Sequence, residues 1–127
     1  MIQANRHTQA GFSMMELMAY TFLVGLLMVA AFVGIRTVRH RANVSTTEQA
    51  LQIVKMAIDG YHARNDEYPA SLNDLKPRYL KEIPKDGWGN ALKYKITEGG
   101  KHPYELDSYG SEGPGGDASE RISVWSK

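Results

Sequence analysis

Hydrophobic and polar positions follow three different patterns along the chain. Leu17–Ile35 is an uncharged apolar run of 19 residues, close to the ~20 residues that a membrane-spanning helix needs. Apolar positions then recur at spacings of three and four, which is typical of an amphipathic helix; they are Val44, Thr47, Leu51, Val54, Ile58 and Tyr61. Further on, alternating positions predict three strands, at Leu92–Ile96, Tyr104–Ser108 and Arg121–Trp125.

These patterns predict an α+β fold in which a long N-terminal helix packs on a small antiparallel sheet. No proline occurs between residues 12 and 68, so one helix of roughly 80 Å extends to about Asn65. Ser71–Asp74 resembles a capping box and predicts a short helical turn that ends near Pro77. We expect the amphipathic stripe to pack against this domain; a free coiled coil is the alternative.

The apolar run is interpreted as a retained membrane helix, residues 12–35. A secretory signal peptide would be followed by a small-residue cleavage site, whereas this run is followed by Arg36, Arg39 and Arg41. A buried helix in a soluble core is the alternative, although 127 residues provide little core to surround it. By the positive-inside rule, these arginines favour a cytoplasmic C-terminal side.

Glu16 is the one charged residue within residues 11–35. An acidic residue costs roughly 2.5–3.5 kcal/mol at the centre of a membrane helix and less near its end. Glu16 therefore lies either at the headgroups or in the first helical turn, where the helix dipole favours it, or it pairs with a cation inside an assembly.

Composition narrows the remaining classes of function. The net charge is only +1, so the chain lacks the excess of positive charge that is typical of a nucleic-acid-binding protein. There is no cysteine, which excludes disulfides and thiolate chemistry. The histidines lack zinc-like spacing; they are His7, His40, His62 and His102. Nothing in the sequence indicates an enzyme.

Residues 11–16, GFSMME, resemble the class III signal of type IV pilins and pseudopilins. The resemblance implies that a prepilin peptidase removes a leader, residues 1–11, by cutting between Gly11 and Phe12. The same enzyme would methylate the new Phe12 amine. Glu16 would then meet the N-terminal amine of a neighbouring subunit during filament assembly.

The C-terminal half resembles the major pseudopilin of type II secretion systems. The shared features include the Leu80–Asp86 run, Trp88–Asn90, and the order of Tyr104, Leu106, Ser108, Gly110 and Gly113. Gly87 and Ala91 stand where that family has prolines. The resemblance implies a pilin-like fold with an amphipathic helix at residues 36–66 and a periplasmic α+β domain at residues 67–127.

In that family the loop after the second strand binds structural Ca²⁺, a cation that takes six to eight oxygen ligands. The matching loop is residues 105–122, and its candidate ligands are the Leu106 carbonyl, Ser108, Glu112, Asp117 and Glu120. Glu112 replaces the usual aspartate, and Arg121 adds a cation. A glycine-rich turn with solvated acids and no metal is the alternative.

The resemblance implies a structural subunit of a periplasmic pseudopilus that drives type II protein secretion. The protein would cross the bacterial inner membrane once and would not bind nucleic acid. Its partners would be further copies of itself, minor pseudopilins, the prepilin peptidase and the inner-membrane secretion platform. The alternatives are a type IV pilin-like subunit for adhesion or DNA uptake and a single-pass, membrane-anchored ligand-binding protein.

Overall fold

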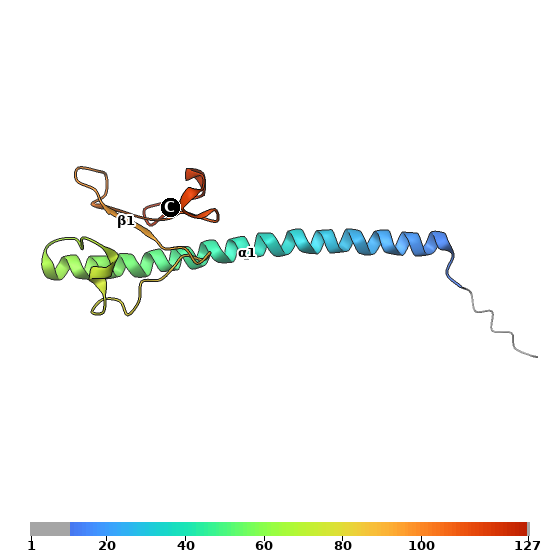
Figure 1. The fold of residues 1–127 in the computed structure, drawn as a ribbon, viewed down its shortest axis with the longest axis horizontal. Helices are drawn as coiled ribbons and strands as arrows, with labels where there is room; N and C mark the ends of the chain where they lie inside the picture. Colours follow the sequence, from blue (N-terminus) through green and yellow to red (C-terminus); the bar gives the residue numbers. More distant parts are fainter. Residues whose placement is uncertain (1–10, 127) are drawn as a thin grey trace, which may run out of the picture. The chain divides into compact units, whose positions relative to one another are not determined.

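A computed structural model describes residues 11–126, which form two compact units divided between Thr37 and Val38. Helix α1 spans Met14–Asn65 and contributes to both units (Figure 1). Its length of 52 residues confirms the prediction of one uninterrupted helix that ends at about Asn65.

The first unit consists mainly of the apolar half of α1. Its large apolar side chains are exposed, from 49% at Val24 to 84% at Met14. Among residues 11–126, α1 is the one helix long and apolar enough to cross a membrane. Because burying one such side chain is worth about 1.5–3 kcal/mol, this surface favours lipid or neighbouring helices over water.

The second unit holds a three-stranded antiparallel sheet on the polar half of α1 (Figure 1). Strands β1 (Lys93–Ile96), β2 (Tyr104–Ser108) and β3 (Ile122–Ser123) follow in that order across the sheet. Tyr94 pairs with Leu106, and Ser108 pairs with Ile122. Three 3-10 helices complete the unit: η1 (Leu72–Leu75), η2 (Gly113–Gly115) and η3 (Ala118–Glu120). The predicted α+β fold is confirmed.

The third strand is shorter than the predicted Arg121–Trp125. Only Ile122 and Ser123 pair regularly with β2, because the following backbone turns: the Ser126 amide donates to the Ser123 carbonyl at 3.1 Å. The Val124 amide still reaches the Leu106 carbonyl, at 3.0 Å. The turn therefore ends regular pairing while Val124 stays in the core.

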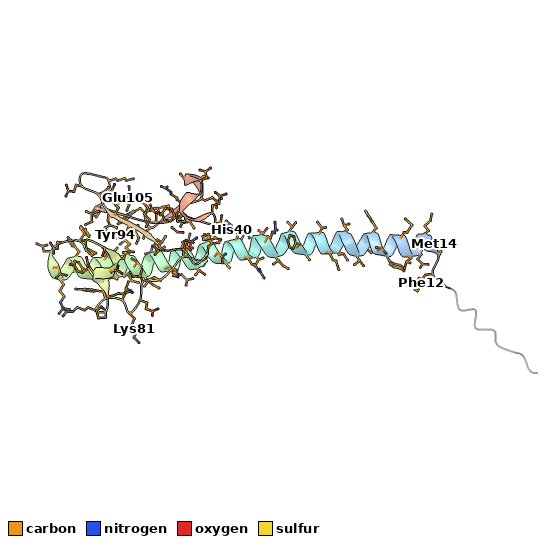
Figure 2. All side chains as sticks on the ribbon, in the orientation of Figure 1. Phe12, Met14, His40, Lys81, Tyr94 and Glu105 are labelled. Carbon is orange, nitrogen blue, oxygen red and sulfur yellow. The ribbon has the colours of Figure 1, made fainter. Side chains whose placement is uncertain are left out.

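The core of the second unit lies between α1 and the sheet, where side chains crowd in Figure 2. From the predicted stripe, Thr47, Leu51, Val54 and Ile58 are buried. The last three belong to one hydrophobic cluster with residues of η1 and of the sheet region: Leu72, Leu75, Leu92, Tyr104, Leu106 and Val124. The stripe therefore packs against the chain's own domain, as predicted.

Tyr94 makes stability depend on alkaline pH. Its hydroxyl donates to the Pro69 carbonyl at 2.8 Å, and burial, with a smaller effect from Tyr68, raises its pKa from 10.0 to about 12. The neutral form is favoured in the folded state, so its stabilisation is complete below pH 10 and is lost as pH rises towards about 12. Urea unfolding followed by tryptophan fluorescence should show that the free energy of unfolding falls between pH 10 and about pH 12. In Tyr94→Phe this free energy should fall less steeply with pH, and an equal slope in the two proteins would contradict the prediction.

Candidate assembly segment and candidate calcium loop

Ser13 caps the N-terminus of α1. Its hydroxyl accepts a hydrogen bond from the Glu16 amide at 3.1 Å, and its carbonyl accepts one from the Leu17 amide at 3.0 Å. Serine is a preferred N-cap because it satisfies an amide that lacks a partner within the helix. The S-x-x-E spacing of Ser13 and Glu16 is that of a capping box. Glu16 therefore lies in the first turn of α1.

Phe12 and Glu16 lie at the same end of the helix, with Tyr20 contacting both. The Phe12 and Tyr20 rings meet edge to face with centroids 6.1 Å apart. The Tyr20 hydroxyl lies 3.5 Å from Glu16 Oε1. Within residues 11–126 no cation forms an ion pair with Glu16. Its position in the first turn agrees with stabilisation by the helix dipole, and pairing in an assembly stays a prediction. Apart from Gly11, the predicted leader lies outside the described residues.

The candidate calcium loop is closed tightly after β2. Gly110 has a φ of +81°, and a Cβ there would lie 2.2 Å from the Glu120 carbonyl oxygen. Only glycine fits both this conformation and this close approach. The Arg121 guanidinium lies over the Tyr109 ring, 5.9 Å from its centroid. The backbone at Gly110 and Glu120 therefore holds the two ends of the loop together.

Each of the five predicted calcium ligands makes a hydrogen bond within the chain. The Leu106 carbonyl accepts from the Val124 amide at 3.0 Å, and the Ser108 hydroxyl donates to Asp86 at 2.7 Å. The three carboxylates accept from loop donors: Glu112 from the Asp117 amide at 3.1 Å, Asp117 from the Ser119 amide at 3.1 Å, and Glu120 from the Ser111 hydroxyl at 3.0 Å.

The loop has the chemistry of a calcium site but not its geometry. Its oxygen donors are the kind that Ca²⁺ takes, yet within residues 11–126 no three acidic or histidine side chains are grouped as metal ligands would be. Each carboxylate accepts one of these hydrogen bonds and keeps further lone pairs that could face a cation. Calcium binding therefore stays a prediction.

Calorimetry tests the calcium prediction. Titrating Ca²⁺ into the full chain in detergent should release or absorb heat and raise the melting temperature. Asp117→Asn should weaken both effects, because a calcium site depends on its anionic ligands. Lys101→Gln, at an exposed position outside the loop, is the control. No heat and no change in melting temperature would favour the metal-free turn.

Asp86 is a buried carboxylate whose importance the sequence analysis missed. It is 5% exposed and accepts hydrogen bonds from the Ser108 hydroxyl at 2.7 Å, the Trp88 amide at 3.1 Å and the Asn90 amide at 2.8 Å. The Ser108 hydroxyl in turn accepts from the Gly110 amide at 3.1 Å. Asp86 thereby connects its own turn to the start of the calcium loop. The Asp-Gly pair at residues 86–87 was a turn signal that could have indicated it.

Ser108→Ala should destabilise the second unit by about 1–3 kcal/mol, because it removes a hydrogen bond from a buried carboxylate. The free energy of unfolding from urea titration measures the loss. Ser111→Ala, which removes an exposed hydroxyl bonded to Glu120, is the matched control and should have a much smaller effect. Equal effects would contradict the role assigned to Asp86.

A second polar contact joins the Asp86 turn to α1. The Gly87 amide donates to the Thr47 hydroxyl at 2.9 Å, and that hydroxyl donates to the Asn43 carbonyl at 2.7 Å. Thr47 was predicted only as a member of the apolar stripe. A Cβ on Gly87 would lie 2.2 Å from the Asn43 carbonyl oxygen. At Gly87 the backbone therefore supplies a donor to α1 at a point where a side chain would collide with the helix.

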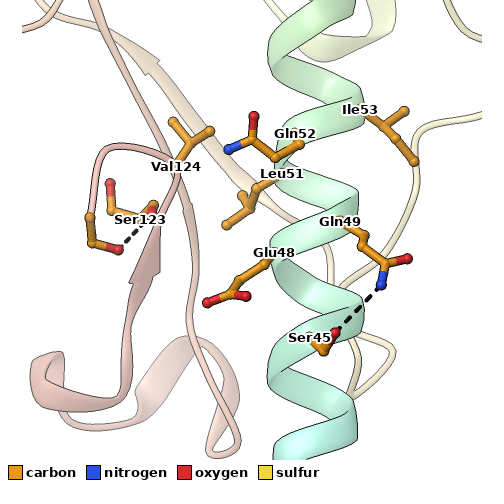
Figure 3. A pocket seen from close by; sticks show the side chains of 9 residues that line it. Ser45, Glu48, Gln49, Leu51, Gln52, Ile53, Ser123 and Val124 are labelled. Carbon is orange, nitrogen blue, oxygen red and sulfur yellow. Dashed lines mark hydrogen bonds between the residues drawn. The ribbon is translucent and has the colours of Figure 1, made fainter.

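A groove of about 500 Å³ lies between α1 and the C-terminal segment (Figure 3). Its lining includes Ser45, Glu48 and Gln52 of α1 and Ser123 and Val124. Glu48 is the one ionisable side chain among the lining residues that the structure describes.

A family model matches most of the chain. The model described as type II secretion system protein G matches residues 35–126. This range includes the Asp86 turn and the candidate calcium loop. Relatives with the name type II secretion system core protein G also match, three of which are described next.

The relative from Pseudomonas aeruginosa is 27% identical over 139 residues, covering 94% of this chain and 97% of its own. That from Vibrio cholerae is 28% identical and covers 85% of this chain and 84% of its own. The relative from Escherichia coli is 25% identical, and the match covers 92% of this chain and 91% of the relative. The family is a structural component of the secretion system. With its long apolar helix and small α+β unit, this chain belongs to the type II secretion system protein G family, the major pseudopilins.

Proposed function

We propose that this chain is the repeating subunit of a pseudopilus, a filament that begins in the bacterial inner membrane and drives type II secretion. The observation that carries the proposal is the exposed apolar surface of α1, with Glu16 as the only charge between Gly11 and Ile35. Stacked subunits would bury this surface against one another.

Maturation precedes assembly in this proposal. A prepilin peptidase removes residues 1–11 and methylates the amine of Phe12. Phe12 is 73% exposed, and a Cβ on Gly11 would have no neighbour within 4 Å. This exposure supports access of an enzyme to the Gly11–Phe12 bond. Assembly would then place Glu16 of one subunit beside the Phe12 amine of another.

The proposal also assigns the regions of the chain. Residues 12–35 span the membrane and form the filament core, residues 36–66 continue the helix, and residues 67–127 form the periplasmic domain. Minor pseudopilins and the inner-membrane secretion platform are the proposed partners. The three arginines after the apolar run favour the opposite orientation, so topology needs its own test with reporter fusions at the C-terminus.

Mass spectrometry of the protein produced with a prepilin peptidase tests the proposal. We expect a mature chain that begins with N-methylated Phe12. Gly11→Val should retain Met1, because a branched side chain replaces the glycine at the predicted cut, whereas Ala10→Val provides a neighbouring control. A wild-type chain that keeps its first 11 residues in the presence of active peptidase would contradict maturation and would favour a membrane-anchored ligand-binding protein.

A further inference from the structure

The two tryptophans of the chain lie at well-separated levels of the second unit. The Trp88 ring contacts the His40 ring, with centroids 5.7 Å apart. The Trp125 ring lies beneath the Lys55 ammonium, 5.4 Å from Nζ to the centroid. His40 and Lys55 are 15 residues apart on α1, which corresponds to about 22 Å along the helix. Trp88 therefore contacts α1 at a residue closer in sequence to the apolar run than the contact of Trp125 is.

Trp88 is held firmly against α1. The Asn43 side-chain amide is oriented so that both of its atoms have a partner. Its oxygen accepts a hydrogen bond from Trp88 Nε1, and its nitrogen donates one to the Gly87 carbonyl, each at 3.2 Å. The Trp88 side chain is half-buried, and it lines a cavity of about 220 Å³ together with His40 and Arg121. The indole thus presents a fixed, partly exposed ring beside the helix.

The stretch of α1 that includes His40, the contact of Trp88, is basic in sequence. Residues 36–47 contain Arg36, Arg39 and Arg41 and no acidic residue. None of these arginines forms an ion pair within residues 11–126. Arg121 is the arginine that lines the cavity itself. Glu120 also lines the cavity, and its carboxylate accepts a hydrogen bond from Ser111. The patch therefore has cations available for an anionic partner.

The sequence keeps this patch close to the apolar run. His40 is five residues beyond Ile35, which limits their separation to about 18 Å even in an extended chain. The headgroup layer is about 5–8 Å thick on each side of the hydrocarbon core. Tryptophan is enriched at this level, and arginine binds phosphate oxygens well.

We propose that Trp88, with Arg39 and Arg41, docks the second unit onto the phosphate headgroups of an anionic bilayer. This docking rests on the membrane anchoring of α1 and does not require cleavage, methylation or filament assembly. It also gives the arginine cluster a role besides topology. The partner is the bilayer surface, and its recognition combines indole insertion with arginine–phosphate contacts.

Depth-dependent quenching tests the proposal on the full chain, inserted in vesicles of phosphatidylglycerol and phosphatidylethanolamine. Trp125→Phe leaves Trp88 as the only fluorophore, and Trp88→Phe leaves Trp125. A lipid with a spin label on its headgroup should quench Trp88 several-fold more than Trp125. Aqueous iodide should show the reverse order. Equal lipid quenching of the two tryptophans, in protein shown to be inserted, would overturn the proposal.

Arginine variants separate the charged contact from simple proximity. In the Trp125→Phe background, Arg39→Gln with Arg41→Gln should reduce headgroup quenching of Trp88, while Arg39→Lys with Arg41→Lys should retain most of it. Unchanged quenching in the glutamine variant would overturn the role of the arginines.

Circular dichroism checks the fold of each variant. If Trp125→Phe unfolds, the difference between wild type and Trp88→Phe reports Trp88. Failure here leaves the mass-spectrometric test of maturation unaffected.

Discussion

Replacing Glu16 by leucine should leave membrane insertion intact and abolish filament assembly. The substitution removes the one charge between Gly11 and Ile35, so insertion becomes more favourable. Assembly, in contrast, would lose the carboxylate proposed to pair with the Phe12 amine of a neighbouring subunit. Cell fractionation measures insertion, and cross-linking with electron microscopy measures filaments.

Two further substitutions sharpen the Glu16 experiment. Glu16→Gln keeps the shape of the side chain and removes its charge, so it should fail to assemble as Glu16→Leu does. Tyr20→Phe removes the hydroxyl that lies 3.5 Å from Glu16 Oε1 and keeps the carboxylate, so it should still assemble. Normal filaments from Glu16→Gln would contradict charge pairing and would leave the dipole interpretation in place.

Gly87→Ala should destabilise the second unit by about 3 kcal/mol, at the upper end of the usual cost of overpacking. The new Cβ would lie 2.2 Å from the carbonyl oxygen of Asn43 and 2.6 Å from the Cα of Asn43. Both atoms belong to the backbone of α1, so no side-chain rotation relieves the clash. Urea unfolding followed by tryptophan fluorescence measures the loss.

Gly87→Pro should cost more than Gly87→Ala. Proline has no amide hydrogen, so the Gly87–Thr47 hydrogen bond of 2.9 Å would also be lost. Gly115→Ala is the matched control, because a Cβ there would meet nothing within 4 Å. Stability of the alanine variant equal to that of the control would show that α1 and the Asp86 turn separate easily.

Local patterns were sufficient to predict the main elements of this fold. The apolar run and the absence of proline between residues 12 and 68 predicted α1, because a helix depends on spacing and on the absence of breakers. Alternation predicted β1 and β2 to within one residue. The prediction was least accurate for β3, where hydrogen bonds of the Ser123–Ser126 turn compete with pairing to β2.

The sequence by itself determined the α+β class, the membrane-length helix, the core-facing stripe and the family. The helix and the stripe depend on the order of residues within a short stretch, whereas the class and the family depend on several such stretches taken together. Only the tertiary structure revealed that Asp86 holds Ser108, that Thr47 holds Gly87, and that Trp88 lies against His40. These contacts join residues 22, 40 and 48 positions apart. Such contacts depend on how the turn at residues 84–90 packs on α1, which no local pattern encodes.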